Sequence, residues 1–80
     1  MITLREVMGE VLRIERNRQR RTLREVSARA GTSLGYISEL ERGVKEPSSE
    51  MIEAVCGALF LELDLFLEMV VNHMREKETV

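Results

Sequence analysis

The segment SLGYISE carries closely spaced groups that suit contact with the edges of nucleic-acid bases. Leu34 can contact a thymine methyl group, Ser38 can donate or accept a hydrogen bond, and Glu39 can accept one from a cytosine amino group. Gly35 has no side chain, so a helix backbone could lie close to the bases there, and Ser33 begins the same segment. These residues predict base contacts; the alternative is that they are only small exposed residues on a surface helix.

Hydroxyl, guanidinium and ammonium groups surround this segment and can donate hydrogen bonds to phosphate oxygens. The candidates are Thr32, Tyr36, Arg21, Arg24, Arg42 and Lys45. The backbone amide at the start of a helix beginning near residue 23 is a further candidate. Each arginine could instead be a solvated surface residue, and Tyr36 could instead be a partly buried core residue.

Two short helices must position these groups, and residues 22–43 contain the pattern for both. We expect helices over residues 23–30 and 34–42, with Gly31 in left-handed backbone at the turn between them. The residues expected to cap them are Thr22, Ser33 and Gly43. The positions expected to meet across the bend are Val26, Ala30, Ile37 and Leu40, with the small Ser27 at the closest approach. This is the helix-turn-helix arrangement, whose second helix enters the major groove of DNA.

Three further helices complete an expected all-α fold of a single small domain over residues 1–80. The first begins at a Thr3 N-cap, with Glu6 in capping-box position, and runs to about residue 18. Its expected core stripe is Leu4, Met8, Val11 and Leu12, widened by Val7 and Ile14. Ser48 caps the next helix, whose expected buried stripe is Met51, Ile52, Val55, Cys56 and Leu59.

The last helix, expected over about residues 63–77, has more apolar side chains than one contact can bury. Two sets lie on different faces: Leu63, Phe66 and Val70, which can close the core, and Leu67, Val71 and Met74, which are left over. We expect the second set to pack against the same helix of a second subunit. The alternative is a wide core helix with a few exposed methyl groups.

Charge is divided unevenly along the chain, although the net charge is only −2. Residues 1–45 hold ten Lys/Arg and six Asp/Glu, a net of +4, whereas residues 46–80 hold two and eight, a net of −6. A DNA-binding protein needs a basic surface only where it meets phosphate, so the acidic half is expected to point away from DNA. The alternative is that the uneven charge is unrelated to DNA, because many small helical proteins show one.

Several classes of function have no support in the composition. No apolar run reaches the eighteen or so residues of a membrane span, and no cluster of nucleophile, base or metal ligands stands out. Cys56 lies on a core stripe, where a small apolar residue is expected and a redox sensor is the alternative; a single cysteine favours a reducing cytoplasm. His73 has no second ligand nearby in sequence, so we expect no metal site. We also expect no cofactor, small-molecule ligand or enzymatic activity, because no catalytic cluster or phosphate-binding loop stands out.

From Met8 to Leu67 the chain resembles the Xre/Cro/phage-repressor family of five-helix, lambda-repressor-like DNA-binding domains. The motifs that carry the resemblance are MGEVLRIER, TLREVSARAGTS, GYISELERG and EPSSEMIEAVCGALFLELDLFL. Within that family, TLREVS and SLGYISELERG are most similar to the actinobacterial regulators of Clp protease genes. The resemblance implies an ion pair between Arg16 and Glu41 that orients the second helix of the motif.

Three positions depart from the family pattern. Leu23 stands where a glutamine often contacts the DNA backbone, which puts that contact in doubt. Arg21 replaces an apolar residue before the cap of the helix over 23–30. Phe60 replaces a glycine after the fourth helix, and a bulky aromatic there favours a dimer contact.

The sequence therefore predicts a cytoplasmic homodimeric transcription regulator that binds double-stranded DNA at a palindromic operator. The resemblance implies control of protease and stress-response genes, often as an activator, although composition and spacing are equally compatible with repression. A phage-type repressor or antitoxin regulator is one alternative. The other is a helical module that binds a protein through its last helix and never contacts DNA.

Overall fold

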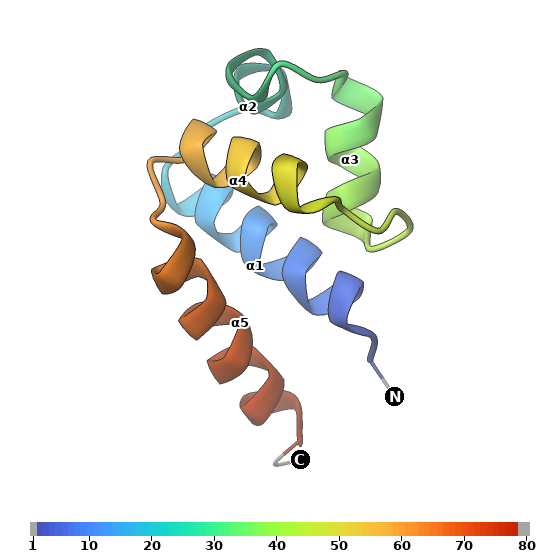
Figure 1. The fold of residues 1–80 in the computed structure, drawn as a ribbon, viewed down its shortest axis with the longest axis vertical. Coiled ribbons are helices and arrows are strands. Elements are labelled where there is room, and N and C mark those ends of the chain that lie inside the picture. Colours follow the sequence, from blue (N-terminus) through green and yellow to red (C-terminus); the bar gives the residue numbers. More distant parts are fainter. Residues whose placement is uncertain (1, 79–80) are drawn as a thin grey trace.

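The computed structural model describes residues 2–78, and this part of the chain forms five α-helices with no strand (Figure 1). In chain order they are α1 (Leu4–Arg18), α2 (Leu23–Ala30), α3 (Leu34–Arg42), α4 (Ser49–Ala58) and α5 (Leu63–Glu78). The expected all-α, five-helix fold is confirmed, and the two helices of the motif have the expected bounds.

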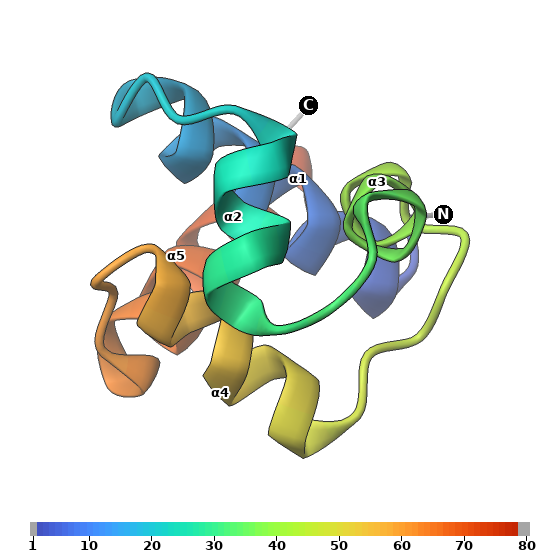
Figure 2. The ribbon, with the colours of Figure 1, turned by 90° about the horizontal axis from the view of Figure 1, so that it is seen from above.

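Helix α1 lies at the centre, with α3 on one side of it and α5 on the other, while α2 crosses above and packs against α4 (Figure 1). Figure 2 shows α2 from the side and α3 nearly end-on, so the two helices point in different directions on either side of the short turn through residues 31–33. α3 therefore lies at one edge of the molecule, and α5 with its acidic side chains lies away from it.

Side-chain caps explain where the helices begin. Thr3 and Thr22 each accept a hydrogen bond from the backbone N–H three residues later, and Glu6 and Glu25 each accept one from the cap residue's own backbone N–H. These are complete capping boxes, which satisfy amide donors that have no partner within the helix. Ser33 and Ser48 cap α3 and α4 in the simpler, one-sided way.

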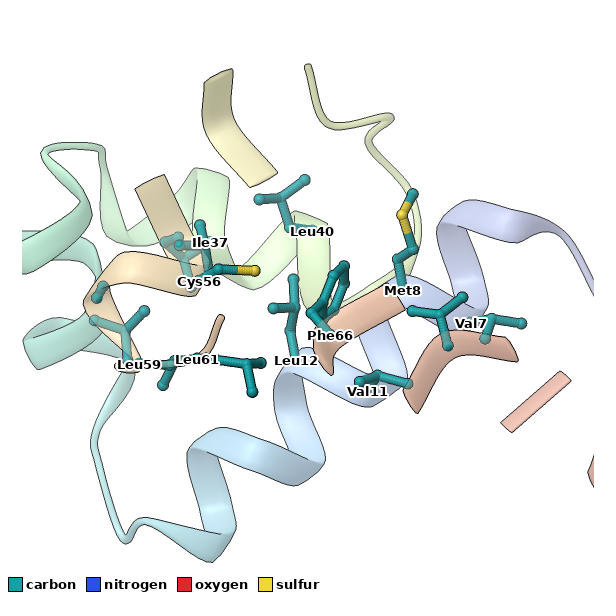
Figure 3. Packing of buried hydrophobic residues seen from close by; sticks show 14 residues of the cluster. Val7, Met8, Val11, Leu12, Ile37, Leu40, Cys56, Leu59, Leu61 and Phe66 are labelled. Atoms are coloured by element: carbon teal, nitrogen blue, oxygen red, sulfur yellow. The ribbon is translucent and has the colours of Figure 1, made fainter. Parts of the chain in front are cut away.

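A core of aliphatic side chains from all five helices holds the fold together, with Phe66 of α5 at its centre (Figure 3). Phe66 is fully buried and lies among Met8 and Leu12 of α1 and Leu40 of α3. The stripes expected on α1 and α4 supply most of the remaining members: Val7, Val11, Val55, Cys56 and Leu59.

The expectation that the whole α1 stripe is buried is wrong for two residues. Leu4 and Ile14 are both about half exposed. Leu4 points in the direction of the stripe but belongs to the first turn of α1, and Ile14 lies at the margin of the stripe. The apolar surface that α1 buries is therefore narrower and shorter than its sequence pattern suggests.

Gly9 sets how closely α1 and α3 approach. A Cβ added at Gly9 would lie 2.3 Å from the carbonyl oxygen of Leu40 and 2.7 Å from that of Glu41. No other residue type could occupy this position without moving the end of α3. The close contact fixes the distance of α3 from the central helix.

Candidate nucleic-acid interface

The turn between α2 and α3 is held by buried contacts, so α3 has a defined angle to α2. Gly31 adopts the left-handed conformation expected for it, with φ 70°, and its N–H donates to the end of α2. Ser27 is buried, and its hydroxyl donates to the carbonyl oxygen of Arg24 at 3.0 Å. Val26 and Ile37 are fully buried across the bend, so the two helices share one apolar contact.

The first turn of α3 is open to solvent. Ser33, Leu34 and Gly35 are exposed, and Leu34 exposes 40% of its surface although its side chain is apolar. A Cβ built at Gly35 would meet no atom within 4 Å. Nothing inside the protein therefore requires glycine at this position, which suits a close approach by a molecule outside it.

Charge at the helix termini distinguishes α3 from the other four helices. Each of those has an acid in its first turn, namely Glu6, Glu25, Glu50 and Asp64, whereas α3 has none. The amide groups at the start of a helix carry partial positive charge, which attracts anions. The start of α3 therefore presents that charge without a carboxylate beside it.

The start of α2 is less favourable for phosphate than the sequence suggested. The side chain of Glu25 accepts a hydrogen bond from the Thr22 backbone N–H, and this bond lowers the pKa of the Glu25 carboxyl. An ionised carboxylate therefore lies beside the amides of α2. Leu23, which stands where the family has a glutamine, is half-buried against the core instead of reaching outward.

An ion pair fixes the far end of α3, as the resemblance implied. The Arg16 guanidinium donates to both oxygens of Glu41, at 2.6 and 3.0 Å, and its third contact is the carbonyl oxygen of Arg21 at 2.8 Å. Both side chains are largely buried. Bidentate geometry restricts the orientation of both groups, so this pair fixes α3 relative to α1 and to the turn before α2.

Next to this pair, a hollow of about 230 Å³ lies between α1, α2 and α3. Its lining residues are Arg13, Arg16, Leu23, Ser38, Glu41 and Arg42. Arg13 and Arg42 are both exposed, and they line the same hollow as the half-buried Ser38. Arg13 was missed by the sequence analysis because it belongs to α1, nine residues before the motif begins.

The remaining candidate residues differ in how much of each side chain is exposed to solvent. Arg24 and Lys45 are exposed, whereas Glu39 and Thr32 are half-buried. Tyr36 is half-buried with its ring against the core, which agrees with the alternative of a core tyrosine.

Arg21 has partners within the protein. Its Nε donates to Gln19 at 2.8 Å, and its guanidinium lies over the Phe60 ring, 5.2 Å from the ring centre. Arg29 of α2 lies over the same ring at 4.8 Å. Phe60 exposes 67% of its surface and has φ 53°, which is the left-handed region that favours glycine.

The surplus apolar face of α5 is present but smaller than expected. Leu67 and Val71 are exposed to 49% and 45%, and Leu63, expected in the core, is also exposed. Met74 is half-buried against the core, because it lies on the side of α5 that packs on α1. Phe60 contacts Arg21 and Arg29, and it does not line the two hollows beside Leu67.

The groups that could support other chemistry have structural surroundings. Burial raises the pKa of the Cys56 thiol to about 11, so the thiol stays protonated at neutral pH and does not suit redox sensing. The Nε2 atom of His73 lies 2.6 Å from the Glu10 carboxylate, which Lys77 also contacts. Within residues 2–78 no cluster of three metal-binding side chains occurs, and no helix there is long and apolar enough to cross a membrane.

Comparisons with known proteins agree with this arrangement. A helix-turn-helix family model matches residues 12–66. The transcriptional regulator ClgR of Mycobacterium tuberculosis is 55% identical over 75 residues, which cover 94% of this chain and 67% of that protein. The clp gene regulator ClgR from Corynebacterium glutamicum has a similar crystal structure, with TM-score 0.93 at 40% identity over 98% of this chain and 83% of the other.

A more distant structure shares the fold alone. It is the restriction-modification controller protein C.Esp1396I, as a tetramer in complex with its natural 35 base-pair operator. The TM-score is 0.85 at 19% identity, over 91% of this chain and 96% of the other. The resemblance noted from the sequence motifs is confirmed by the matches to the family model and to ClgR. The chain belongs to the Xre-type helix-turn-helix family of transcription regulators.

Proposed function

We propose that this regulator binds double-stranded DNA by placing the first turn of α3 in the major groove. The observation that carries the proposal is the open start of α3, where Leu34 and Gly35 are exposed and no acid lies in the first turn. An anionic groove therefore meets partial positive charge and no carboxylate in the first turn of α3. The Arg16–Glu41 pair and the close contact at Gly9 supply the rigidity that base recognition requires.

Base recognition is assigned to residues along one side of α3. Leu34 would contact thymine methyl groups, Ser38 would hydrogen bond to a base edge, and Glu39 would accept from a cytosine or adenine amino group. Gly35 would let the helix backbone approach the bases.

Phosphate contacts are assigned to exposed basic groups on either side of α3. The exposed members are Arg13, Arg24, Arg42 and Lys45, with Thr32 at the turn before α3. Arg21 is a weaker candidate, because its guanidinium already lies over Phe60. Such contacts position the protein on DNA and carry no sequence information themselves.

The proposed regulator is a homodimer, and α5 supplies the contact between subunits. Leu67 and Val71 are half exposed on one face of α5, and no element within residues 2–78 covers them. Two linked copies would place two α3 helices in successive major grooves, so the operator is expected to be palindromic. By similarity to ClgR, the target genes are expected to include Clp protease and stress-response genes.

Selection of bound duplexes from a random pool tests the proposal directly. We expect an enriched palindrome with half-sites about one helical turn apart, and binding that weakens steeply as salt rises. Fluorescence anisotropy on the full palindrome and on a single half-site would then separate dimeric from monomeric binding. Failure to enrich any sequence, with binding insensitive to salt, would favour a module that binds protein through α5.

The dimer contact has its own test. Changing Leu67 and Val71 to aspartate is expected to yield folded monomers that bind the palindrome far more weakly, because linkage raises the effective concentration of the second α3. Ile14→Asp is the matched control, since Ile14 is equally exposed but lies on α1. Sedimentation showing that the doubly changed protein remains a dimer would contradict the assignment of α5.

A further inference from the structure

One stripe of α5 carries opposite charges at its two ends, and Leu67, Val71, the acid Glu68 and the amide Asn72 lie between them. A shallow hollow of about 480 Å³ runs along it. Its lining residues are Asp64, Leu67, Glu68, Val71, Asn72 and Arg75. They recur every three or four positions, so they share one face of the helix over about 16 Å.

The charges at the two ends of the stripe have no ionic partner within residues 2–78. Asp64 and Arg75 are both exposed, and neither takes part in an ion pair there. The charged groups that tie α5 to α1 lie on another face, where His73 and Lys77 contact Glu10 at 2.6 and 3.3 Å. Asp64 and Arg75 are therefore left to face whatever covers Leu67 and Val71.

The stripe is complementary to a second copy of itself in the antiparallel orientation. Consider a two-fold axis that places Leu67 of one copy against Val71 of the other. Three residues further out, Asp64 then lies opposite position 74, next to Arg75. By symmetry the same contact forms at both ends, so an antiparallel pair gains two apolar contacts and two ion pairs. The two Glu68 side chains lie near the axis in this pairing and in a parallel one, so they do not decide between the two directions.

A parallel pairing lacks this complementarity. It would place Asp64 beside the Asp64 of the other copy and Arg75 beside the other Arg75. Like charges held side by side are destabilising, whereas opposite charges are stabilising. The pattern of charge therefore selects one direction of packing.

We propose that α5 pairs antiparallel with α5 of a second copy, with Asp64 of each chain facing Arg75 of the other. This inference rests on the proposed homodimer and adds its direction, its register and its ionic contacts. Arg75 would reach over the rim of the hollow to the start of the other α5. Both ion pairs would lie at the solvent-exposed edge of the contact.

Sedimentation equilibrium without DNA, at low salt, tests the register. D64R and R75D are each expected to raise the dimer dissociation constant about tenfold or more, because two attractive pairs become two repulsive ones. The double variant D64R/R75D is expected to return to within about threefold of the unchanged protein. E62R is the matched control, because Glu62 is an exposed acid that immediately precedes α5 and lies outside the hollow.

Mixing the two single variants distinguishes contacts between chains from contacts within one chain. A dimer formed from one D64R chain and one R75D chain has opposite charges at both ends, whereas either homodimer has like charges. We therefore expect the mixture to form heterodimers in preference to both homodimers. A contact within one chain would give no such preference.

Two contrary results have different meanings. If L67D dissociates the dimer but D64R, R75D and their mixture behave as the unchanged protein does, the α5 dimer stands and the proposed register is wrong. If the unchanged protein is monomeric at all concentrations, or if L67D leaves the dimer intact, the proposed homodimer through α5 fails and the register fails with it.

Discussion

Replacing Gly35 with alanine separates the two effects that a glycine can have in a recognition helix. Within the protein an alanine side chain at this position would meet no atom within 4 Å, so the folded state gains no clash. Alanine is favoured over glycine in a helix by up to about 1 kcal/mol. For a domain of this size, Gly35→Ala should therefore raise the melting temperature by about 4 °C.

The same substitution should weaken DNA binding if the backbone of α3 approaches the bases as proposed. A methyl group forced into a close-packed contact costs about 1–3 kcal/mol. A cost near the lower end corresponds to about a tenfold higher dissociation constant for the operator. The variant would thus be more stable and yet bind less well, a combination that general damage to the fold cannot produce.

Gly57→Ala is the matched control. Gly57 is also a helical glycine whose added Cβ would meet no atom within 4 Å, but it lies in α4. It should show a similar rise in melting temperature with unchanged operator affinity, measured by thermal unfolding and fluorescence anisotropy on the same samples. If Gly35→Ala binds the operator as tightly as the unchanged protein, the backbone of α3 does not lie against the bases and the reasoning is refuted.

Three further predictions concern two residues of the candidate interface and one buried acid. Lys45→Ala should weaken binding to all DNA sequences alike, and the slope of log affinity against log salt concentration should become smaller by about one unit. Arg21→Ala is the control and should leave this slope unchanged. If Lys45→Ala has the same slope as the unchanged protein, Lys45 does not belong to the interface. Glu39→Gln should alter base preference at one symmetric pair of operator positions by about 1–3 kcal/mol on a panel of single-base variants, and a uniform gain across the panel would mean that Glu39 reads no base. Glu15 is nearly fully buried, and its hydrogen bonds from Arg18 and then Gln19 lower the pKa of its carboxyl below the ordinary 4.5. The contribution of the Glu15 carboxylate to stability is therefore present above pH 4.5 and lost as pH falls through the lowered pKa. Thermal unfolding should show that Glu15→Gln is less stable than the unchanged protein at pH 7. Between pH 5 and pH 3 the variant should lose less stability than the unchanged protein does.

Local signals in the sequence were enough to predict the bounds of α2 and α3. Thr22 and Ser33 are N-caps whose partner lies three residues away, and Gly31 and Gly43 adopt the left-handed conformation that ends each helix. Each of these features is decided by interactions within one turn of helix. Tertiary packing did not need to be known in advance.

Contacts between distant residues could not be predicted in the same way. Ile14 is 51% exposed because no other helix covers it, and periodicity along α1 does not say which helices will cover which positions. Arg13 joins the candidate interface because α1 passes behind the motif, and His73 meets Glu10 across 63 residues of chain. The Arg16–Glu41 pair was anticipated only through the family resemblance, because nothing local marks its members.

Two of the three departures from the family pattern, Arg21 and Phe60, contact one another. Arg21 replaces an apolar residue and Phe60 replaces a glycine, and the Arg21 guanidinium lies over the Phe60 ring, with Arg29 over the same ring. An aromatic residue in left-handed backbone costs about 1–2 kcal/mol, and a cation over an exposed ring returns about 0.5–1 kcal/mol. Two such contacts therefore offset most of the strain at Phe60, which explains how this chain tolerates a bulky residue where its family has glycine. The same contacts hold Arg21 beside Phe60, so we expect phosphate to be contacted by exposed cations such as Arg13, Arg24, Arg42 and Lys45 instead.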